Sequence, residues 1–219
     1  MVDTRAQSRS IRAYEEVRRL IIEGAVQPGD RMNVRQLGER LGVSPTPVKA
    51  ALAALARDGL VTSRTNRGYV VTVLGEQDVR ELFELREALE PYAVRRAVSD
   101  GATAVALDEL RRLTLAQRKA VDAADLAGYN DLNLRFHQTL WQLAGNRRLT
   151  QLMDNIVGQM SLVTTFTSRA PGRVEHAIAE HAAIVEMCAD RRLEELGALV
   201  ARHVRDSYVA YLHMVTWMS

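Results

Sequence analysis

The segment from Val43 to Val61, VSPTPVKAALAALARDGLV, constrains the fold more than any other part of this sequence. Pro45 and Pro47 lack backbone N–H groups, so a helix tolerates them only within its first turn. Ser44, directly before them, has a hydroxyl that can accept backbone N–H bonds as an N-cap. The alanine and leucine residues that follow favour a helix, and Gly59 is placed to end it. The segment therefore predicts one helix with a rigid, polar start.

A shorter helix is expected directly before this one. Asn33 can cap a helix that runs through Arg40, and Gly42 is well placed to terminate it. The link to the next helix is then only LGVS, which is the length of a helix-turn-helix connection. A further amphipathic helix is predicted for residues 11–23, whose apolar residues fall on one helical face.

Two short strands are predicted after the proline-containing helix, at Leu60–Ser63 and Tyr69–Val73. The sequence RTNRG between them carries a turn signal in Asn66 and Gly68. The order helix, helix, tight turn, helix, hairpin is that of a winged helix-turn-helix, a DNA-binding fold. A small helical domain without that role is the alternative, and the basic tip of the hairpin argues against it.

The distribution of charge supports a nucleic-acid-binding module at the N-terminal end. Residues 1–74 contain 12 Lys and Arg against 7 Asp and Glu, a net charge of +5. The remaining residues contain 17 Lys and Arg against 20 Asp and Glu, a net charge of −3. The two parts add up to the total net charge of +2. A basic part beside a mildly acidic one suggests a polyanion-binding module joined to a domain of another kind.

Composition excludes several other classes of protein. The single cysteine, Cys188, allows no internal disulfide, and it reads as a small buried residue rather than a catalytic nucleophile. The start MVDTRAQSRS contains no apolar segment that could serve as a signal peptide. No apolar run approaches the roughly 18 residues of a membrane span. A cytoplasmic location is therefore expected.

The chain from Gly75 onward has helical periodicity and no strand signals. Helices are expected at residues 78–99, 104–120, 125–145, 147–168, 174–189 and 192–217, with breaks short enough to give an antiparallel bundle. The expected fold is mainly α, with a winged helix-turn-helix over residues 1–74 and an all-helical domain over residues 75–219.

The N-terminal part closely resembles the GntR family of bacterial transcription regulators. The resemblance is carried by the PGDRM loop, by VRQLGERLGVSPTPVKAALAALARDGLV and by the wing RGYVV. The C-terminal part resembles the helical FCD ligand-binding domain of the FadR-like branch, through ELFELREALEPYAVRRA, LNLRFHQTLWQLAGNRRL, EHAAIVEMC and ARHV. Six expected helices are more similar to the VanR-type subgroup than to the seven-helix FadR type.

The resemblance implies a set of DNA-contacting residues, with the helix that starts at Ser44 in the major groove. These residues are Arg35, Ser44, Thr46, Lys49, Arg67 and Gly68. Many relatives have arginine at the place of Pro45 and often at that of Lys49. Arginine can contact guanine O6 and N7 with two hydrogen bonds, whereas proline has no donor. Lysine can still reach guanine or a phosphate, with looser geometry.

The resemblance also implies a divalent metal site inside the bundle, held by an aspartate and three histidines. The matching residues here are Asn133, His137, His181 and His203, so a neutral amide stands in the place of the aspartate. Three imidazoles and an amide oxygen can still bind Zn²⁺ or Ni²⁺, with less charge compensation. The alternative is three hydrogen-bonded core histidines that line a metal-free cavity. His176 and His213 match no family position and are treated as ordinary residues.

Arg86 is a candidate anchor for an effector, because a guanidinium pairs with a carboxylate through two hydrogen bonds. The alternative for Arg86 is a structural ion pair with a neighbouring glutamate. By family analogy the effector is a small metabolite, expected to be an organic acid.

The main functional hypothesis is a homodimeric transcription regulator, more often a repressor in such a family, that binds a palindromic operator and responds to an effector. The segment at residues 72–78 is the expected hinge. The alternatives are a metal-dependent helical enzyme with a vestigial DNA-binding module, for which Glu180 is the only obvious nearby acid, and a nonspecific architectural DNA-binding protein.

Overall fold

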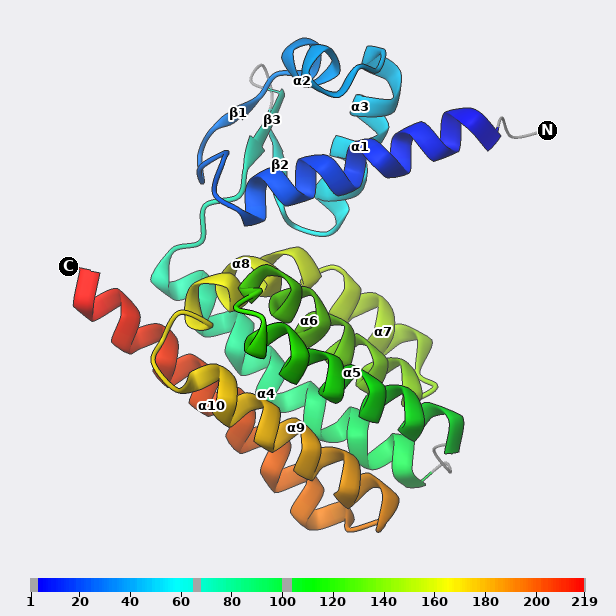
Figure 1. The fold of residues 1–219 in the computed structure, drawn as a ribbon, viewed down its shortest axis with the longest axis vertical. Coiled ribbons are helices and arrows are strands. Elements are labelled where there is room, and N and C mark those ends of the chain that lie inside the picture. Colours follow the sequence, from blue (N-terminus) through cyan, green and yellow to red (C-terminus); the bar gives the residue numbers. More distant parts are fainter. Residues whose placement is uncertain (1–3, 65–67, 100–103, 219) are drawn as a thin grey trace. The chain divides into compact units, whose positions relative to one another are not determined.

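The computed structural model describes residues 4–64, 68–99 and 104–218. By their internal contacts these residues form two compact units, and Figure 1 shows both as ribbons. The first unit comprises residues 1–74 together with 155–162, and the second comprises residues 75–154 and 163–219. Among the described residues, no helix combines the length and the apolar character that crossing a membrane requires.

The N-terminal segment of the first unit contains three helices and a small sheet within its described residues, and residues 157–162 of a later helix complete this unit. The helices are α1 (Thr4–Ile22), α2 (Val34–Leu41) and α3 (Pro45–Arg57), and the strands are β1 (Arg31–Met32), β2 (Val61–Arg64) and β3 (Gly68–Val71). The strands pair antiparallel in the order β1-β3-β2. The sequence predicts the presence of the three helices and the hairpin, although α1 begins seven residues before the expected start at residue 11. It misses β1, because two residues are too few to show an alternating pattern.

The turn between α2 and α3 depends on two glycines. Asn33 caps α2 as predicted, since its side chain accepts the backbone N–H groups of Arg35 and Gln36. Gly42 follows the helix with φ of 64°, in the left-handed region that glycine adopts without strain. A Cβ on Gly38 would lie 2.8 Å from the carbonyl oxygen of Val43. The backbone therefore passes close over α2 before α3 begins.

The prediction that Ser44 accepts capping hydrogen bonds is wrong. Ser44 occupies the N-cap position of α3 with extended backbone angles, but its side chain makes no capping bond. An N-cap oxygen accepts from the second or third residue of the helix. The third residue here is Pro47, which has no N–H, so only the N–H of Thr46 is left as a donor, and it makes no such bond. The hydroxyl of Ser44 is consequently left exposed to solvent.

The apolar face of α3 forms the centre of the first unit. Val48, Leu52 and Leu55 are fully buried, as their helical spacing predicts. They pack with apolar residues of α1 and of the hairpin, among them Val17, Leu20, Leu60, Val61 and Val71. This packing fixes one face of α3 and leaves the opposite face exposed.

The second unit is a bundle of helices. The helices of this part of the chain are α4 (Glu76–Ser99), α5 (Ala104–Asp122), α6 (Leu126–Leu143), α7 (Arg147–Asp154), α8 (Val157–Thr167), α9 (Arg173–Ala189) and α10 (Leu193–Met218). α10 packs along α4, and α5 packs against both α6 and α9 (Figure 1). The described residues thus confirm a mainly helical protein.

The prediction of six C-terminal helices is wrong, because the described residues form seven. The helix expected at residues 147–168 is interrupted at residues 155–156, which separates α7 from α8. Asn155 falls at the interruption, and asparagine favours turns over helix interiors. The helix count therefore no longer favours the VanR-type subgroup.

The core of the bundle is apolar along most of its length. Five helices contribute to it, through residues that include Val94, Leu110, Leu113, Phe136, Leu140, Ile184, Leu196 and Val200. Cys188 belongs to the same cluster and is 6% exposed. Burial raises the pKa of its thiol to about 12, so the thiol stays protonated at neutral pH. The structure thus agrees with a packing role for Cys188.

We expect Gly42→Ala to destabilise the first unit by about 1–2 kcal/mol, the cost of a left-handed conformation for a residue with a Cβ. No atom lies within 4 Å of the position a Cβ would take, so the loss comes from the backbone alone. Gly42→Asn is the matched control and should lose less, since asparagine tolerates this conformation. Urea unfolding followed by circular dichroism measures both. Equal losses for the two variants would contradict the explanation.

Candidate functional site

The exposed face of α3 and its surroundings carry the predicted DNA-contacting residues. Ser44, Thr46 and Lys49 are exposed at the start of α3, and Gly68 is exposed at the start of β3. Arg35 lies on α2 with its side chain 84% exposed, 3.6 Å from Glu39. Arg67 lies outside the described residues. The described members of the set are thus all accessible to a partner.

Three histidines from three helices meet in the interior of the bundle. His137 of α6, His181 of α9 and His203 of α10 are each at most 2% exposed. Their ring centroids lie 4.9 to 5.3 Å apart. One ring nitrogen from each histidine lies within 4.8 Å of the others, and the Nε2 atoms of His137 and His203 are 3.3 Å apart. The sequence-predicted histidines therefore form one cluster.

Each of the three rings is oriented by a hydrogen bond at Nδ1. The partners are Glu90 Oε2 for His137 at 3.0 Å, Gln117 Oε1 for His181 at 2.8 Å and Glu180 Oε2 for His203 at 2.7 Å. An oxygen at Nδ1 fixes the tautomer that carries its proton there and leaves Nε2 as the free acceptor. The three Nε2 atoms are thereby presented to one another.

The sequence analysis did not identify these orienting residues as part of the site. A signal for two of them is present, because each interrupts an apolar helical face. Gln117 follows Leu110 and Leu113 at helical spacing and is fully buried, and Glu90 precedes the buried Val94 by one turn. A polar residue at a core position must find a partner. Such positions on neighbouring helices are candidates for the polar groups that hold a buried site.

The donor set fits a divalent metal ion. Ligands at zinc distances in a tetrahedral arrangement lie about 3.3 Å from each other, which matches the separation of His137 Nε2 and His203 Nε2. His181 Nε2 is buried and has no hydrogen-bond partner among the described residues. A buried nitrogen without a partner is costly, and a metal ion would remove that cost.

Burial keeps His181 and His203 in the neutral form that a metal requires. It is the largest cause that lowers the pKa of His181, and the neighbouring His203 and His137 lower it further. The pKa of His203 is lowered well below its ordinary value, again by burial first and then by His137. Phe136 stacks on the ring of His181 at 4.1 Å and supports its orientation.

A narrow polar cavity adjoins the histidine cluster. Its volume is ≈ 20 Å³, and its lining comprises Arg86, Tyr129, Asn133, His137, Thr164, Thr167, Ser168, Arg173, Ala177, His203 and Ser207. A cavity of this size holds about one water molecule. Asn133 lines it one helical turn before His137, so the fourth predicted residue lies beside the cluster.

Arg86 makes the structural ion pair that the sequence analysis weighed against an effector role. Its Nε donates to Glu90 Oε1 at 2.6 Å, and the two side chains are 5% and 3% exposed. Burial alone would raise the pKa of Glu90, but the interactions of its carboxylate with Arg86 and His137 outweigh burial and lower that pKa. Because Arg86 also lines the cavity, the ion pair and contact with a ligand are compatible.

A winged helix-turn-helix joined to a helical domain with a buried histidine site defines a class of ligand-responsive DNA-binding regulators. The sequence profile described as "FCD domain" matches residues 81–206, and that of "Bacterial regulatory proteins, gntR family" matches residues 9–71. This chain therefore belongs to the GntR family of bacterial transcription regulators and carries a C-terminal FCD domain.

Named relatives cover most of the chain. It is 27% identical over 198 residues to the Bacillus subtilis regulator YdhC, covering 87% of this chain and 85% of that protein. It is 28% identical to the Escherichia coli transcriptional repressor RspR, covering 86% of this chain and 78% of that protein. It is also 29% identical to the Nta operon transcriptional regulator of Aminobacter aminovorans, covering 86% of this chain and 88% of that protein.

Solved structures share the fold. Escherichia coli McbR/YncC superposes with a TM-score of 0.80 at 20% identity, covering 98% of this chain and 100% of that one. A GntR regulator from Rhodococcus sp. RHA1 superposes with a TM-score of 0.77 at 24% identity, covering 94% of this chain and 98% of that one. The alternative of a metal-dependent helical enzyme receives no support from these comparisons.

We expect Arg86→Met to destabilise the protein by about 3–5 kcal/mol, because it leaves the Glu90 carboxylate buried without its partner. The double variant Arg86→Met with Glu90→Gln should regain most of that loss, since no buried charge remains and the amide oxygen can still accept from His137. Denaturant unfolding of both variants measures the difference. If the double variant is as unstable as the single one, the buried charge is not the cause.

Proposed function

We propose that this protein is a homodimeric repressor whose affinity for a palindromic operator changes when a small carboxylate metabolite binds beside a metal in the FCD domain. The observation that carries the proposal is the buried cluster of His137, His181 and His203, with the Nε2 atoms facing one another. The repressor assignment is supported by relatives that are named repressors, among them RspR and GlaR of Escherichia coli.

The proline-containing start of α3 would enter the major groove. Ser44 and Thr46 are exposed there, and Lys49, also exposed, follows Thr46 by about one helical turn. Hydroxyls and an ammonium group suit phosphate oxygens and base edges. A two-fold dimer would present this surface twice, to two half-sites of one operator.

The three histidines, with Asn133 as a fourth oxygen donor, would hold Zn²⁺ or Ni²⁺. A bound metal would supply a positive centre for a carboxylate oxygen. Without the usual aspartate, the charge of the metal would be balanced by Glu90 and Glu180, which contact His137 and His203 from outside the cluster. Such contacts make the imidazoles stronger ligands.

The cavity lining suggests the chemistry of the effector. Arg86 and Arg173 can pair with a carboxylate, and Thr164, Thr167 and Ser207 offer hydroxyls for further oxygen atoms. A metabolite larger than water requires the cavity of ≈ 20 Å³ to widen. That widening would give the ligand a differential affinity for two arrangements of the domain, which regulation of DNA binding requires.

We expect Lys49→Ala to weaken binding to operator DNA about fivefold to 150-fold, the range for loss of one good base contact of about 1–3 kcal/mol. Fluorescence anisotropy with DNA from upstream of the protein's own gene measures the affinity at fixed salt. Lys119→Ala is the matched control, since Lys119 is an exposed lysine of the bundle. Pro45→Arg should change base preference in a selection over randomised sites. Absence of sequence-specific binding by the unaltered protein would refute the proposal.

We expect Gln117→Ala to weaken Zn²⁺ binding at the histidine cluster about 10- to 100-fold, because it removes the group that orients His181. Removal of metal by a chelator should lower the thermal midpoint of the unaltered protein, since a ligand of the native state stabilises it. Isothermal titration and thermal denaturation measure the two effects. His213→Ala is the control and should behave as the unaltered protein. Unchanged zinc affinity in both Gln117→Ala and His181→Ala would contradict a metal at this cluster.

A further inference from the structure

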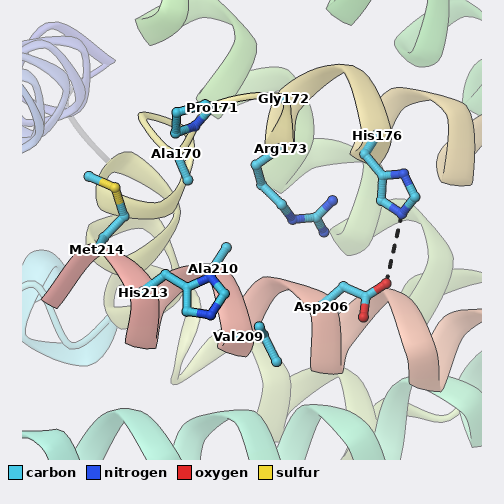
Figure 2. A pocket seen from close by; sticks show the side chains of 10 residues that line it. All are labelled: Ala170, Pro171, Gly172, Arg173, His176, Asp206, Val209, Ala210, His213 and Met214. Atoms are coloured by element: carbon cyan, nitrogen blue, oxygen red, sulfur yellow. Dashed lines mark ion pairs between the residues drawn. The ribbon is translucent and has the colours of Figure 1, made fainter. Parts of the chain in front are cut away.

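A second group of metal-binding side chains lies beside the buried cluster, where the sequence predicted nothing. His176 and Glu180 are one turn apart on α9, and Asp206 approaches them from α10. His176 Nε2 is 3.3 Å from Glu180 Oε1 and 3.8 Å from Asp206 Oδ2. Figure 2 shows His176 and Asp206 facing each other from the two helices.

The separation of His176 Nε2 and Glu180 Oε1 is that expected of two ligands on one metal ion, and that of His176 Nε2 and Asp206 Oδ2 is somewhat longer. Two atoms bound to zinc at tetrahedral angles lie about 3.3 Å apart, and the ligand atoms of all three side chains lie within 4.8 Å of one another. An imidazole nitrogen with two carboxylate oxygens is a donor set that suits zinc and similar divalent ions.

One buried oxygen of the group makes no hydrogen bond within the part of the chain that the structure describes. Glu180 is 5% exposed, and its Oε1 is buried and makes no hydrogen bond among the described residues, although His176 Nε2 lies 3.3 Å away. Its Oε2 is fully used, by His203 Nδ1 at 2.7 Å and by Arg173 at 3.2 Å. A buried carboxylate oxygen without a partner costs free energy, and a cation at Oε1 would remove that cost.

The group is accessible to an ion from solvent. The side chains of His176 and Asp206 are 60% and 40% exposed, and both line an open pocket of ≈ 700 Å³ (Figure 2). Arg173 lies in the same pocket, but its guanidinium contacts the Oε2 side of Glu180. The two carboxylates of the group supply a charge of −2 against the single positive charge of Arg173.

We propose that His176, Glu180 and Asp206 form a second, outer binding site for a divalent transition-metal ion of the zinc type. This outer site does not require the inner histidine cluster to be occupied. The two are nevertheless linked, because the same carboxylate holds the outer ion through Oε1 and orients His203 through Oε2. Occupancy of the outer site therefore changes the hydrogen bond that positions an inner ligand, and by linkage each site affects the affinity of the other.

The number of zinc ions bound per chain tests the outer site. The full-length protein, without an affinity tag and stripped of metal, is titrated with Zn²⁺ by calorimetry. We expect two equivalents for the unaltered chain and one each for His176→Ala and Asp206→Asn. His213→Ala removes another histidine of the same pocket, outside the group, and should retain two. Glu180 is unsuitable for substitution, since it also holds His203. Circular dichroism checks that the variants fold. We expect them to fold, because the side chains of His176 and Asp206 are exposed.

The inner cluster is titrated separately through His181→Ala. With both sites functional, this variant binds one equivalent and the combination with His176→Ala binds none. If the unaltered chain binds one equivalent that His176→Ala abolishes and His181→Ala does not affect, the outer site stands and the inner metal proposal fails. If His176→Ala and Asp206→Asn bind as much zinc as the unaltered chain, with the same affinity, the outer site is refuted.

Discussion

Three imidazole rings can lie in the interior of the helical domain only because each has a hydrogen-bond acceptor at Nδ1. Glu90, Gln117 and Glu180 supply those acceptors from α4, α5 and α9. Burial of a polar group is tolerated when its bonds are made and costly when they are not. The cluster therefore ties together five helices of the bundle, since the histidines add α6 and α10. The geometry of the site therefore depends on how these five helices pack.

The carboxylates of the cluster are themselves shared. Glu90 contacts Arg86 through Oε1 and His137 through Oε2, so an ion pair on α4 holds a ring on α6. Glu180 contacts both His203 and Arg173, and Arg173 also donates to the hydroxyl of Ser207. In such a network the removal of one member leaves charged neighbours unpaired. A ligand that engages either arginine must therefore alter the support of a histidine.

Much of the first unit could be predicted from sequence because local chemistry decides it. The cap at Asn33, the left-handed Gly42 and the buried face of α3 follow from residue types and spacing. The prediction for Ser44 fails at the same local level, since Pro47 removes one of the two N–H groups that a cap could use. The two-residue β1 escapes prediction because only pairing with β3 defines it. Short strands depend on their partners rather than on their own sequence.

In the helical domain the positions of the helices can be predicted from the local sequence, whereas the side-chain groups that form between helices cannot. The apolar pattern locates its helices, but it continues through residues 155–156 and so conceals the break between α7 and α8. The inner histidines were predicted through family resemblance, whereas their partners Glu90 and Gln117 were not. His176 shows why, because its relation to Glu180 is local while its relation to Asp206 depends on how α10 packs against α9. Side-chain groups that form across helices are specified by packing, which a single sequence does not display.

The small inner cavity has a consequence for regulation. A volume of ≈ 20 Å³ accommodates a water molecule but no organic acid, so a metabolite can enter only by displacing side chains that line it. Arg173 lines both this cavity and the open pocket on the surface, and its bonds to Glu180 and Ser207 would have to change. The free energy spent on that rearrangement lowers the affinity of the ligand. The same rearrangement couples ligand binding to a change in the conformation of the domain. A cavity that was already open would bind the ligand more tightly, but binding would then cause a smaller change in the conformation of the domain.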